Sequence, residues 1–163
     1  MHTRQGEFER IRTVLAEAAF YRFWFWSGMA VPPGRELTTQ HSVFTAGYDT
    51  ARGLQLQYPP FAAHERVLRD PLHYRETQAL GTAMRSAGAG GFEYLSARDP
   101  ERGLNVGLFE PAALSPRERI LGREEWTCTT SATRVAFFNI AARVTREFSF
   151  ETFVVDGKLP RPA

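Results

Sequence analysis

The first helix expected from the sequence is the feature that most limits how this chain can fold. Apolar residues recur at three- to four-residue spacing over residues 7–26, which predicts an amphipathic helix. Its last turns carry aromatic side chains in nearly every direction around the axis: Phe20, Tyr21, Phe23, Trp24, Phe25 and Trp26. A helix that is apolar all round must be enclosed. We expect its own domain to enclose it, and the alternative is self-association or partner binding through Phe20, Trp24 and Trp26.

The rest of the chain combines β-prone segments with two further helices. Strands are expected over residues 37–48, 53–57, 92–95, 104–109, 125–130, 133–140 and 144–155, and helices over 61–68 and 70–87. The longer helix is expected to start at Asp70-Pro71, because an acidic N-cap followed by proline is a common helix start. This mixture indicates a single α+β domain, residues 1–156, with a disordered tail, residues 157–163.

Composition excludes several classes of function. Lysine and arginine number 20 against 18 acidic residues and are spread along the chain, so no basic stripe for nucleic acid is expected. Cys128 is the only cysteine and the four histidines lack metal-ligand spacing, so neither a disulfide nor a metal site is expected. No segment has the pattern of a secretion signal or the length of a membrane span. We therefore expect a cytoplasmic protein that does not contact the membrane.

A polar interruption in residues 78–111 suggests a binding site. A helix ends at Gly88, a strand follows, and the polar group Ser96-Ala97-Arg98-Asp99-Pro100 separates it from a second strand. Binding groups commonly lie at strand ends, because a rigid scaffold positions them while a ligand can still reach them. The alternative is that this group forms only a hydrogen-bonded turn that closes a hairpin.

Glu17 is an acid within the apolar first helix. In a cleft, such a carboxylate can hold a sugar hydroxyl or stabilise a developing positive charge, as cleavage of a glycosidic bond requires. Alternatively it lies on a solvated side of the helix or pairs with Arg10, Arg12 or Arg22. The local sequence leaves both interpretations open.

Several short motifs, in their order and spacing, resemble those of the RES-domain family. They are RTVLAEAAFYR from Arg12, DPLHY from Asp70, QAL from Gln78, RSAG from Arg85, YLSAR from Tyr94 and residues 105–111. The resemblance implies a fold similar to that of ADP-ribosyltransferases, with a mixed sheet packed with helices. It also implies a bacterial toxin that consumes NAD+ or transfers its ADP-ribose, with an Xre-type antitoxin as its partner.

The resemblance assigns residues position by position. Glu17 matches the family glutamate and Ser96 the family serine, which implies catalytic roles for both. Tyr21, Arg98 and Asn105 lie in the matched segments and are expected to bind NAD+, the substrate. No metal is implied.

One part of the family pattern has no match. The family carries an arginine and a tyrosine ahead of the glutamate helix, and residues 1–11 contain no such segment. This departure indicates a shortened variant, a mis-assigned start or a degraded copy, unless Arg4, Arg10 or Arg12 substitutes. The alternative function is therefore a module that binds an antitoxin or itself without turnover.

Overall fold

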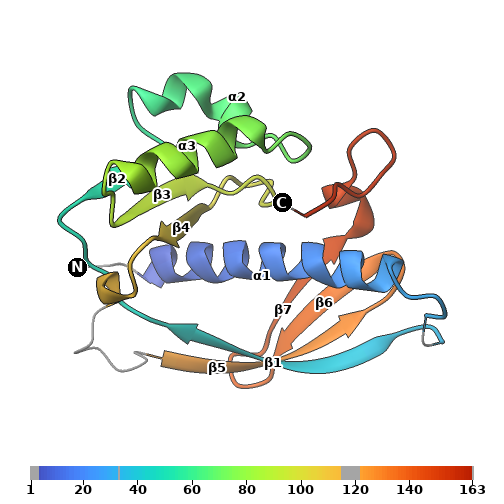
Figure 1. Ribbon diagram of the computed structural model, residues 1–163. Coiled ribbons are helices and arrows are strands. Elements are labelled where there is room, and N and C mark those ends of the chain that lie inside the picture. Colours follow the sequence, from blue (N-terminus) through green and yellow to red (C-terminus); the bar gives the residue numbers. More distant parts are fainter. Residues whose placement is uncertain (1–3, 33, 115–121, 163) are drawn as a thin grey trace.

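A long central helix separates two unequal layers of the molecule. The structure, a computed structural model, describes residues 4–32, 34–114 and 122–162, and in the first helix the side chains from Ile11 onward. Helix α1 (Arg4–Ser27) lies between a four-stranded sheet on one side and a smaller sheet with two helices on the other (Figure 1). The expected α+β class is confirmed, although the strands form two sheets rather than one.

The larger sheet is antiparallel throughout and carries the main core. Its strands are β1 (Leu37–Thr45), β5 (Gly122–Thr130), β6 (Arg134–Asn139) and β7 (Val144–Ser149), in that spatial order. The core consists of buried apolar side chains of α1 packed against the inner face of this sheet: Leu15, Ala16, Ala19, Phe20, Phe23, Trp126, Cys128, Val135, Phe137 and Phe148. Each large side chain buried there contributes about 1.5–3 kcal/mol to folding. This packing fixes the rotation of α1 about its axis.

The aromatic run of α1 is only partly enclosed. Phe20 and Trp26 are 1% and 8% exposed, so two of the three residues considered for self-association lie inside their own domain. The third, Trp24, is 37% exposed, and Tyr21 and Phe25 beside it are 48% and 52% exposed. The expectation of enclosure is therefore correct for one side of the helix, while an apolar strip remains open on the other.

The smaller sheet is mixed. It contains β2 (Gly53–Gln55), β3 (Gly91–Leu95) and β4 (Leu104–Leu108), with β2 parallel to β3 and β3 antiparallel to β4. Two helices, α2 (Glu65–Leu68) and α3 (Arg75–Ser86), accompany it above α1 (Figure 1). The outer strand β4 contacts α1, which places the ends of β3 and β4 against the middle of that helix.

Helix α3 starts later than the sequence suggests. Asp70 does not cap a helix; its Oδ1 accepts hydrogen bonds from the backbone N–H groups of Leu72 at 2.8 Å and His73 at 3.1 Å. This is a side-chain turn, and aspartate before proline favours such a turn as well as a helix start. The expected boundary was therefore wrong by five residues.

The end of the chain also differs from the expectation. The segment expected as a strand over 144–155 leaves the sheet at Ser149 and continues as a 3-10 helix (Phe150–Phe153), because Phe153 turns inward and is 5% exposed. Pro160 is buried, and the backbone carbonyl of Arg161 accepts a hydrogen bond from the Tyr74 hydroxyl at 3.1 Å. Within the segment expected as a disordered tail, Leu159 and Pro160 therefore pack on the domain, while Gly157, Lys158 and Arg161 are exposed.

Candidate functional site

Glu17 lies where α1 meets the ends of β3 and β4, and three side chains donate hydrogen bonds to it. Ser96 Oγ donates to Glu17 Oε1 at 2.7 Å and Asn105 Nδ2 donates to the same oxygen at 2.8 Å. Arg98 Nη1 contacts the other oxygen, Oε2, at 3.2 Å. The Glu17 side chain is 24% exposed. The Glu17 side chain is therefore held firmly in place yet can still be reached from outside.

The polar turn after β3 combines the two interpretations that the sequence left open. Ser96 Oγ accepts hydrogen bonds from the backbone N–H groups of Arg98 at 3.1 Å and Asp99 at 3.0 Å, as a capping serine does. Its single hydroxyl hydrogen goes to Glu17. A hydroxyl offers one donor and two acceptor positions, so this one is fully used. Ser96, 0% exposed, is thus placed to orient Glu17.

Asp99 ties this turn to α1. Its side chain is 0% exposed and forms an ion pair with Arg12. Its Oδ2 accepts hydrogen bonds from the Thr13 hydroxyl at 2.8 Å and the Gly103 N–H at 3.2 Å, and Oδ1 accepts one from the Glu101 N–H at 3.0 Å. A buried carboxylate is stable only with such complete pairing. The turn and the helix are therefore joined as one unit, and Ser96 cannot shift without breaking buried hydrogen bonds.

Gly103 allows this close approach. A Cβ at this position would lie 1.7 Å from Thr13 Oγ1 and 2.6 Å from Asp99 Oδ2. From the other side, Arg69 Nε donates to the backbone carbonyl of Ser96 at 2.9 Å, and its Nη2 donates to that of Asp99 at 3.3 Å. The turn is thus held from α1 and from the segment after α2.

Arg98 is held between aromatic rings. Its guanidinium carbon lies 3.8 Å from the ring centroid of Phe20 and 5.2 Å from that of Tyr21. Its Nη2 donates to the Tyr74 hydroxyl oxygen at 3.4 Å. Cations over aromatic faces are stabilised by the ring quadrupole, more strongly when they are desolvated. Arg98 is 13% exposed, so its main role in this arrangement is to pair with Glu17.

Tyr94 and Asn105 face each other across β3 and β4 and complete the site. The pKa of the Tyr94 hydroxyl is raised, first by burial and then by the negative charge of Glu17, while a hydrogen bond with Asn105 and the charge of Arg98 oppose the shift. Tyr94 therefore remains a neutral phenol at physiological pH. A neutral hydroxyl beside Glu17 can donate a hydrogen bond to a polar ligand.

All five residues expected from the sequence meet at this place. Glu17, Ser96, Arg98 and Asn105 are directly bonded, and Tyr21 joins them through the Arg98 guanidinium. The pairing of Glu17 with Arg12 or Arg22 that local sequence left open does not occur. Arg12 pairs with Asp99 and Glu101, and Arg22 Nε donates to Thr130 Oγ1 at 3.0 Å.

Further residues of the site were given no role there by the sequence, although most of them stand in the motifs or in the polar group named above. They are Arg12, Thr13, Arg69, Tyr74, Tyr94 and Asp99. Asp99 stood in the polar turn but was read only as a turn residue, because its partner Thr13 is 86 residues away. Arg12, considered as a substitute for the family arginine, is engaged by two carboxylates. The side chains of Arg4 and Arg10 lie outside the described residues.

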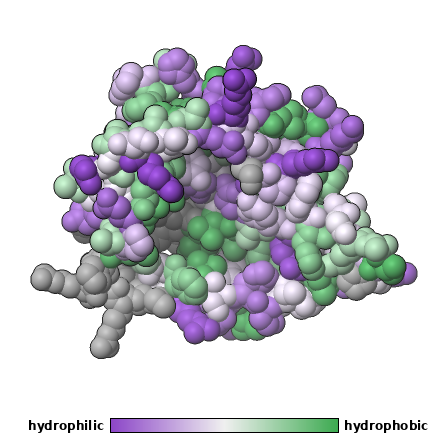
Figure 2. Space-filling model, viewed as in Figure 1, coloured by the Kyte–Doolittle hydropathy of each residue, from purple (hydrophilic) through white to green (hydrophobic). Residues whose placement is uncertain are grey.

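The surface is hollowed on the side of α1 that carries the smaller sheet. Figure 2 shows this hollow near the centre of the face, with hydrophobic residues at its lower border, over the first half of α1 beside β4. A separate surface hollow of about 360 Å³ lies between α2 and α3 and is lined by Arg66, Val67, Asp70, His73 and Glu76. That second hollow contains none of the residues around Glu17. The hollow between α2 and α3 is therefore separate from the candidate site.

The part of the chain that the structure describes contains neither a cluster of metal-binding side chains nor a helix that could cross a membrane. Among residues 4–32, 34–114 and 122–162, no group of three or more His, Cys, Asp or Glu lies close enough to hold a metal ion. Within the same ranges, no helix has both the length and the apolar character needed to cross a membrane. The Cys128 thiol is buried in β5, and burial is the main cause of its raised pKa.

Comparison with known proteins identifies the class. The RES domain family matches residues 8–131, a segment that includes α1 from its fifth residue onward, the smaller sheet and every residue bonded to Glu17. The chain belongs to the RES domain family, which is known for NAD-related modules of toxin–antitoxin systems. None of the curated proteins matches the chain.

Proposed function

We propose that this protein binds NAD+ and cleaves the bond between nicotinamide and ribose, as the toxin of a toxin–antitoxin pair. The observation that carries the proposal is the set of three donors, from Ser96, Asn105 and Arg98, that fixes the Glu17 carboxylate at a reachable position. Membership of the RES domain family supports NAD+ as the substrate. The chemistry of a fixed carboxylate supports cleavage at a sugar carbon.

The role of Glu17 follows from the charge that develops in the reaction. As the bond between C1′ and the pyridinium nitrogen breaks, its electron pair leaves with neutral nicotinamide and positive charge appears on the ribose. A preorganised carboxylate stabilises such a cation without having to reorient. Glu17 accepts three hydrogen bonds, while a carboxylate offers about four acceptor positions. The remaining position is suited to a ribose hydroxyl.

The other residues divide between holding Glu17 and contacting the substrate. Ser96 has no hydrogen-bonding capacity left, so we assign it a positioning role. Asn105 and the neutral Tyr94 hydroxyl are half-buried beside Glu17 and are placed to contact the nicotinamide ribose. The Arg98 guanidinium contacts Glu17, Tyr74 and Phe20, so any contact of this group with phosphate is secondary. The cation is then captured at C1′ by phosphate, or by water or a protein side chain that loses a proton.

The test is direct. Purified protein is incubated with NAD+, in phosphate buffer and in phosphate-free buffer, with heat-denatured protein as the control. We expect nicotinamide release in equal amount to NAD+ loss, and the mass of the second product identifies the acceptor. If NAD+ remains intact at high protein concentration in both buffers, the proposed activity is contradicted.

We also propose that the open strip of α1 binds a protein partner, with the Xre-type antitoxin as the expected one. Val14, Tyr21, Trp24 and Phe25 are 50%, 48%, 37% and 52% exposed and lie along one side of the helix, next to Glu17. Adjacent exposed apolar side chains of this size commonly mark an interface. A partner seated there would also cover the site.

Size-exclusion chromatography of the protein coexpressed with the neighbouring antitoxin gene tests this interface. Phe25→Ala should abolish the complex, and the matched control Phe138→Ala, on the outer face of β6, should leave it intact. A complex that survives Phe25→Ala and Trp24→Ala together contradicts this surface. In the absence of antitoxin, a concentration-dependent dimer lost in the same variants indicates self-association instead.

A further inference from the structure

A row of aromatic rings extends away from Glu17 along the smaller sheet. Phe92 and Tyr94 share one face of β3, and their ring centroids are 5.5 Å apart. Phe109, directly after β4, continues the row, with its centroid 5.3 Å from that of Phe92. Tyr94 is the end of the row beside Glu17, whose charge contributes to raising the pKa of its hydroxyl. The row of rings therefore begins beside Glu17, at Tyr94, and ends away from the candidate site, at Phe109.

The rings are arranged to lie along the sheet surface. On β4, Gly107 pairs with Phe92, and a Cβ at Gly107 would come within 2.5 Å of two ring carbons of Phe92. The absence of a side chain at Gly107 thus allows the Phe92 ring to rest against the strand. Both Phe92 and Phe109 are half-buried, and neither belongs to the main core between α1 and the larger sheet. A flat, partly open pair of rings of this kind can stack a planar base.

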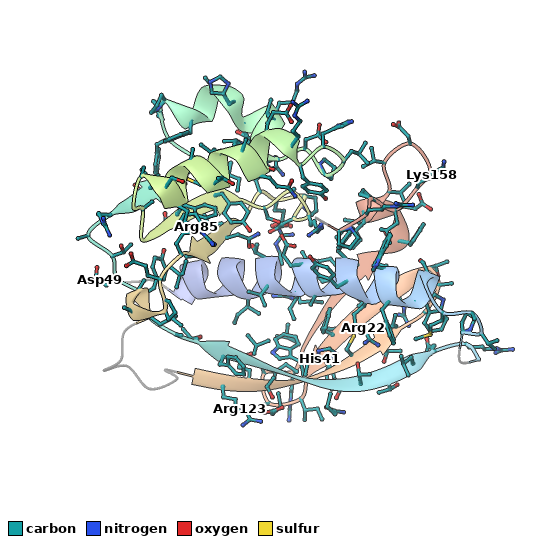
Figure 3. The ribbon with its side chains drawn as sticks, viewed as in Figure 1. Arg22, His41, Asp49, Arg85, Arg123 and Lys158 are labelled. Atoms are coloured by element: carbon teal, nitrogen blue, oxygen red, sulfur yellow. The ribbon has the colours of Figure 1, made fainter. Side chains whose placement is uncertain are left out.

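A cation lies at the far end of the row. The guanidinium carbon of Arg85, in the last turn of α3, is 5.1 Å from the ring centroid of Phe109. Arg85 is exposed, and no carboxylate or hydrogen-bonding side chain pairs with it among the side chains that the structure describes, which in α1 begin at Ile11. Figure 3 shows Arg85 below α3, on the side that faces α1, and Figure 2 shows the surface hollow in that region. An unpaired guanidinium beside aromatic rings suits a phosphate ester that carries a base.

We propose that Phe92, Phe109 and Arg85 form the subsite for the adenylate half of the dinucleotide, with the adenine stacked on the rings and Arg85 against its phosphate. The inference rests on the proposed function, which places the nicotinamide ribose at Glu17. Charge favours this orientation over the reverse, because the nicotinamide of NAD+ is cationic and would be repelled by Arg85, while the diphosphate would be attracted.

Binding of AMP, which lacks the nicotinamide half, tests the subsite without requiring catalysis. By calorimetry, we expect AMP to bind the wild type, Phe109→Leu to weaken it about tenfold, and Arg85→Gln to weaken it about fivefold with a smaller dependence on salt. Phe138→Leu and Arg123→Gln, on the far sheet, are the matched controls and should not change it. Nicotinamide mononucleotide, which lacks the adenylate, should bind wild type and variants alike.

The outcomes separate this inference from the proposed function. AMP that does not bind the wild type, or binds equally to Phe109→Leu and Arg85→Gln, overturns the subsite even if NAD+ is cleaved. AMP binding that is lost in both variants, in a protein that leaves NAD+ intact, supports the subsite and refutes the activity. Arg85 is exposed, so Arg85→Gln tests the subsite even if Phe109→Leu fails to fold.

Discussion

Replacing Asp99 by asparagine removes the charge that joins the Ser96 turn to α1. The Asp99 side chain is 0% exposed and accepts from Arg12, Thr13 and two backbone N–H groups. In the variant, the amide NH₂ of the asparagine replaces a carboxylate oxygen and faces hydrogen-bond donors from which it cannot accept. The Arg12 cation also loses its buried partner. Breaking a buried ion pair by removing one partner costs about 3–5 kcal/mol. Because Arg12 is 18% exposed and also reaches Glu101, we expect the lower value, about 3 kcal/mol.

The chain supplies a matched control at the same arginine. Glu101 pairs with Arg12 at 2.7 Å, but its side chain is 72% exposed. An exposed pair contributes less than about 1 kcal/mol, so Glu101→Gln should be nearly neutral. Both substitutions replace a carboxylate by an amide of the same size, and they differ in burial and in the number of bonds lost.

Urea denaturation followed by tryptophan fluorescence measures the difference. With a slope of about 2 kcal/mol per molar urea, Asp99→Asn should lower the midpoint by about 1.5 M and Glu101→Gln by less than about 0.5 M. Nicotinamide release should fall in Asp99→Asn under conditions where it is fully folded, because Ser96 no longer holds Glu17. Equal midpoints for the two variants would refute the argument that burial makes Asp99 the anchor of the turn.

Two further predictions concern packing and protonation. Gly103→Ala should lower the free energy of unfolding by more than about 2 kcal/mol, because the new Cβ would lie 1.7 Å from Thr13 Oγ1. The control Gly81→Ala, with open space around it in α3, should raise the free energy of unfolding by at most about 1 kcal/mol. Similar melting temperatures for the two variants would contradict this. The pKa of His41 is lowered, first by burial and then by the charge of Arg22, so the folded state favours neutral imidazole and stability falls as pH drops below the ordinary value of 6.5. His41→Gln should therefore lose less stability than the wild type between pH 7 and pH 5, and parallel losses in urea melts would refute it.

The sequence predicted the fold class and the site for different reasons. Periodicity and strand propensity were enough for the α+β class and for most elements, because α1 and the larger sheet bury continuous apolar faces. The boundary at Asp70 was missed because the same residue pair favours a turn and a helix start, and only the bonds to Leu72 and His73 decide between them. Local signals cannot choose between two structures that use the same hydrogen-bonding capacity.

The site depended on contacts that no local pattern contains. Glu17 and Ser96 were expected from the family resemblance, but their hydrogen bond joins residues 79 positions apart. Asp99 was read as part of a turn, which is correct, while its bond to Thr13 depends on how α1 is rotated by the core beneath it. Arg98 was expected to bind NAD+, and it is found paired with Glu17 and stacked on Phe20, because both lie on the same side of α1.

The most direct test of the account is the rate of nicotinamide release by Glu17→Gln relative to the wild type. Glutamine keeps the size of the side chain and an oxygen for Ser96 and Asn105, so the fold should be retained, while the charge that stabilises the ribosyl cation is lost. Electrostatic contributions of this kind change rates by about 10²–10³-fold, and we expect a loss of that size. A folded Glu17→Gln variant that releases nicotinamide as fast as the wild type would contradict the central role of this carboxylate.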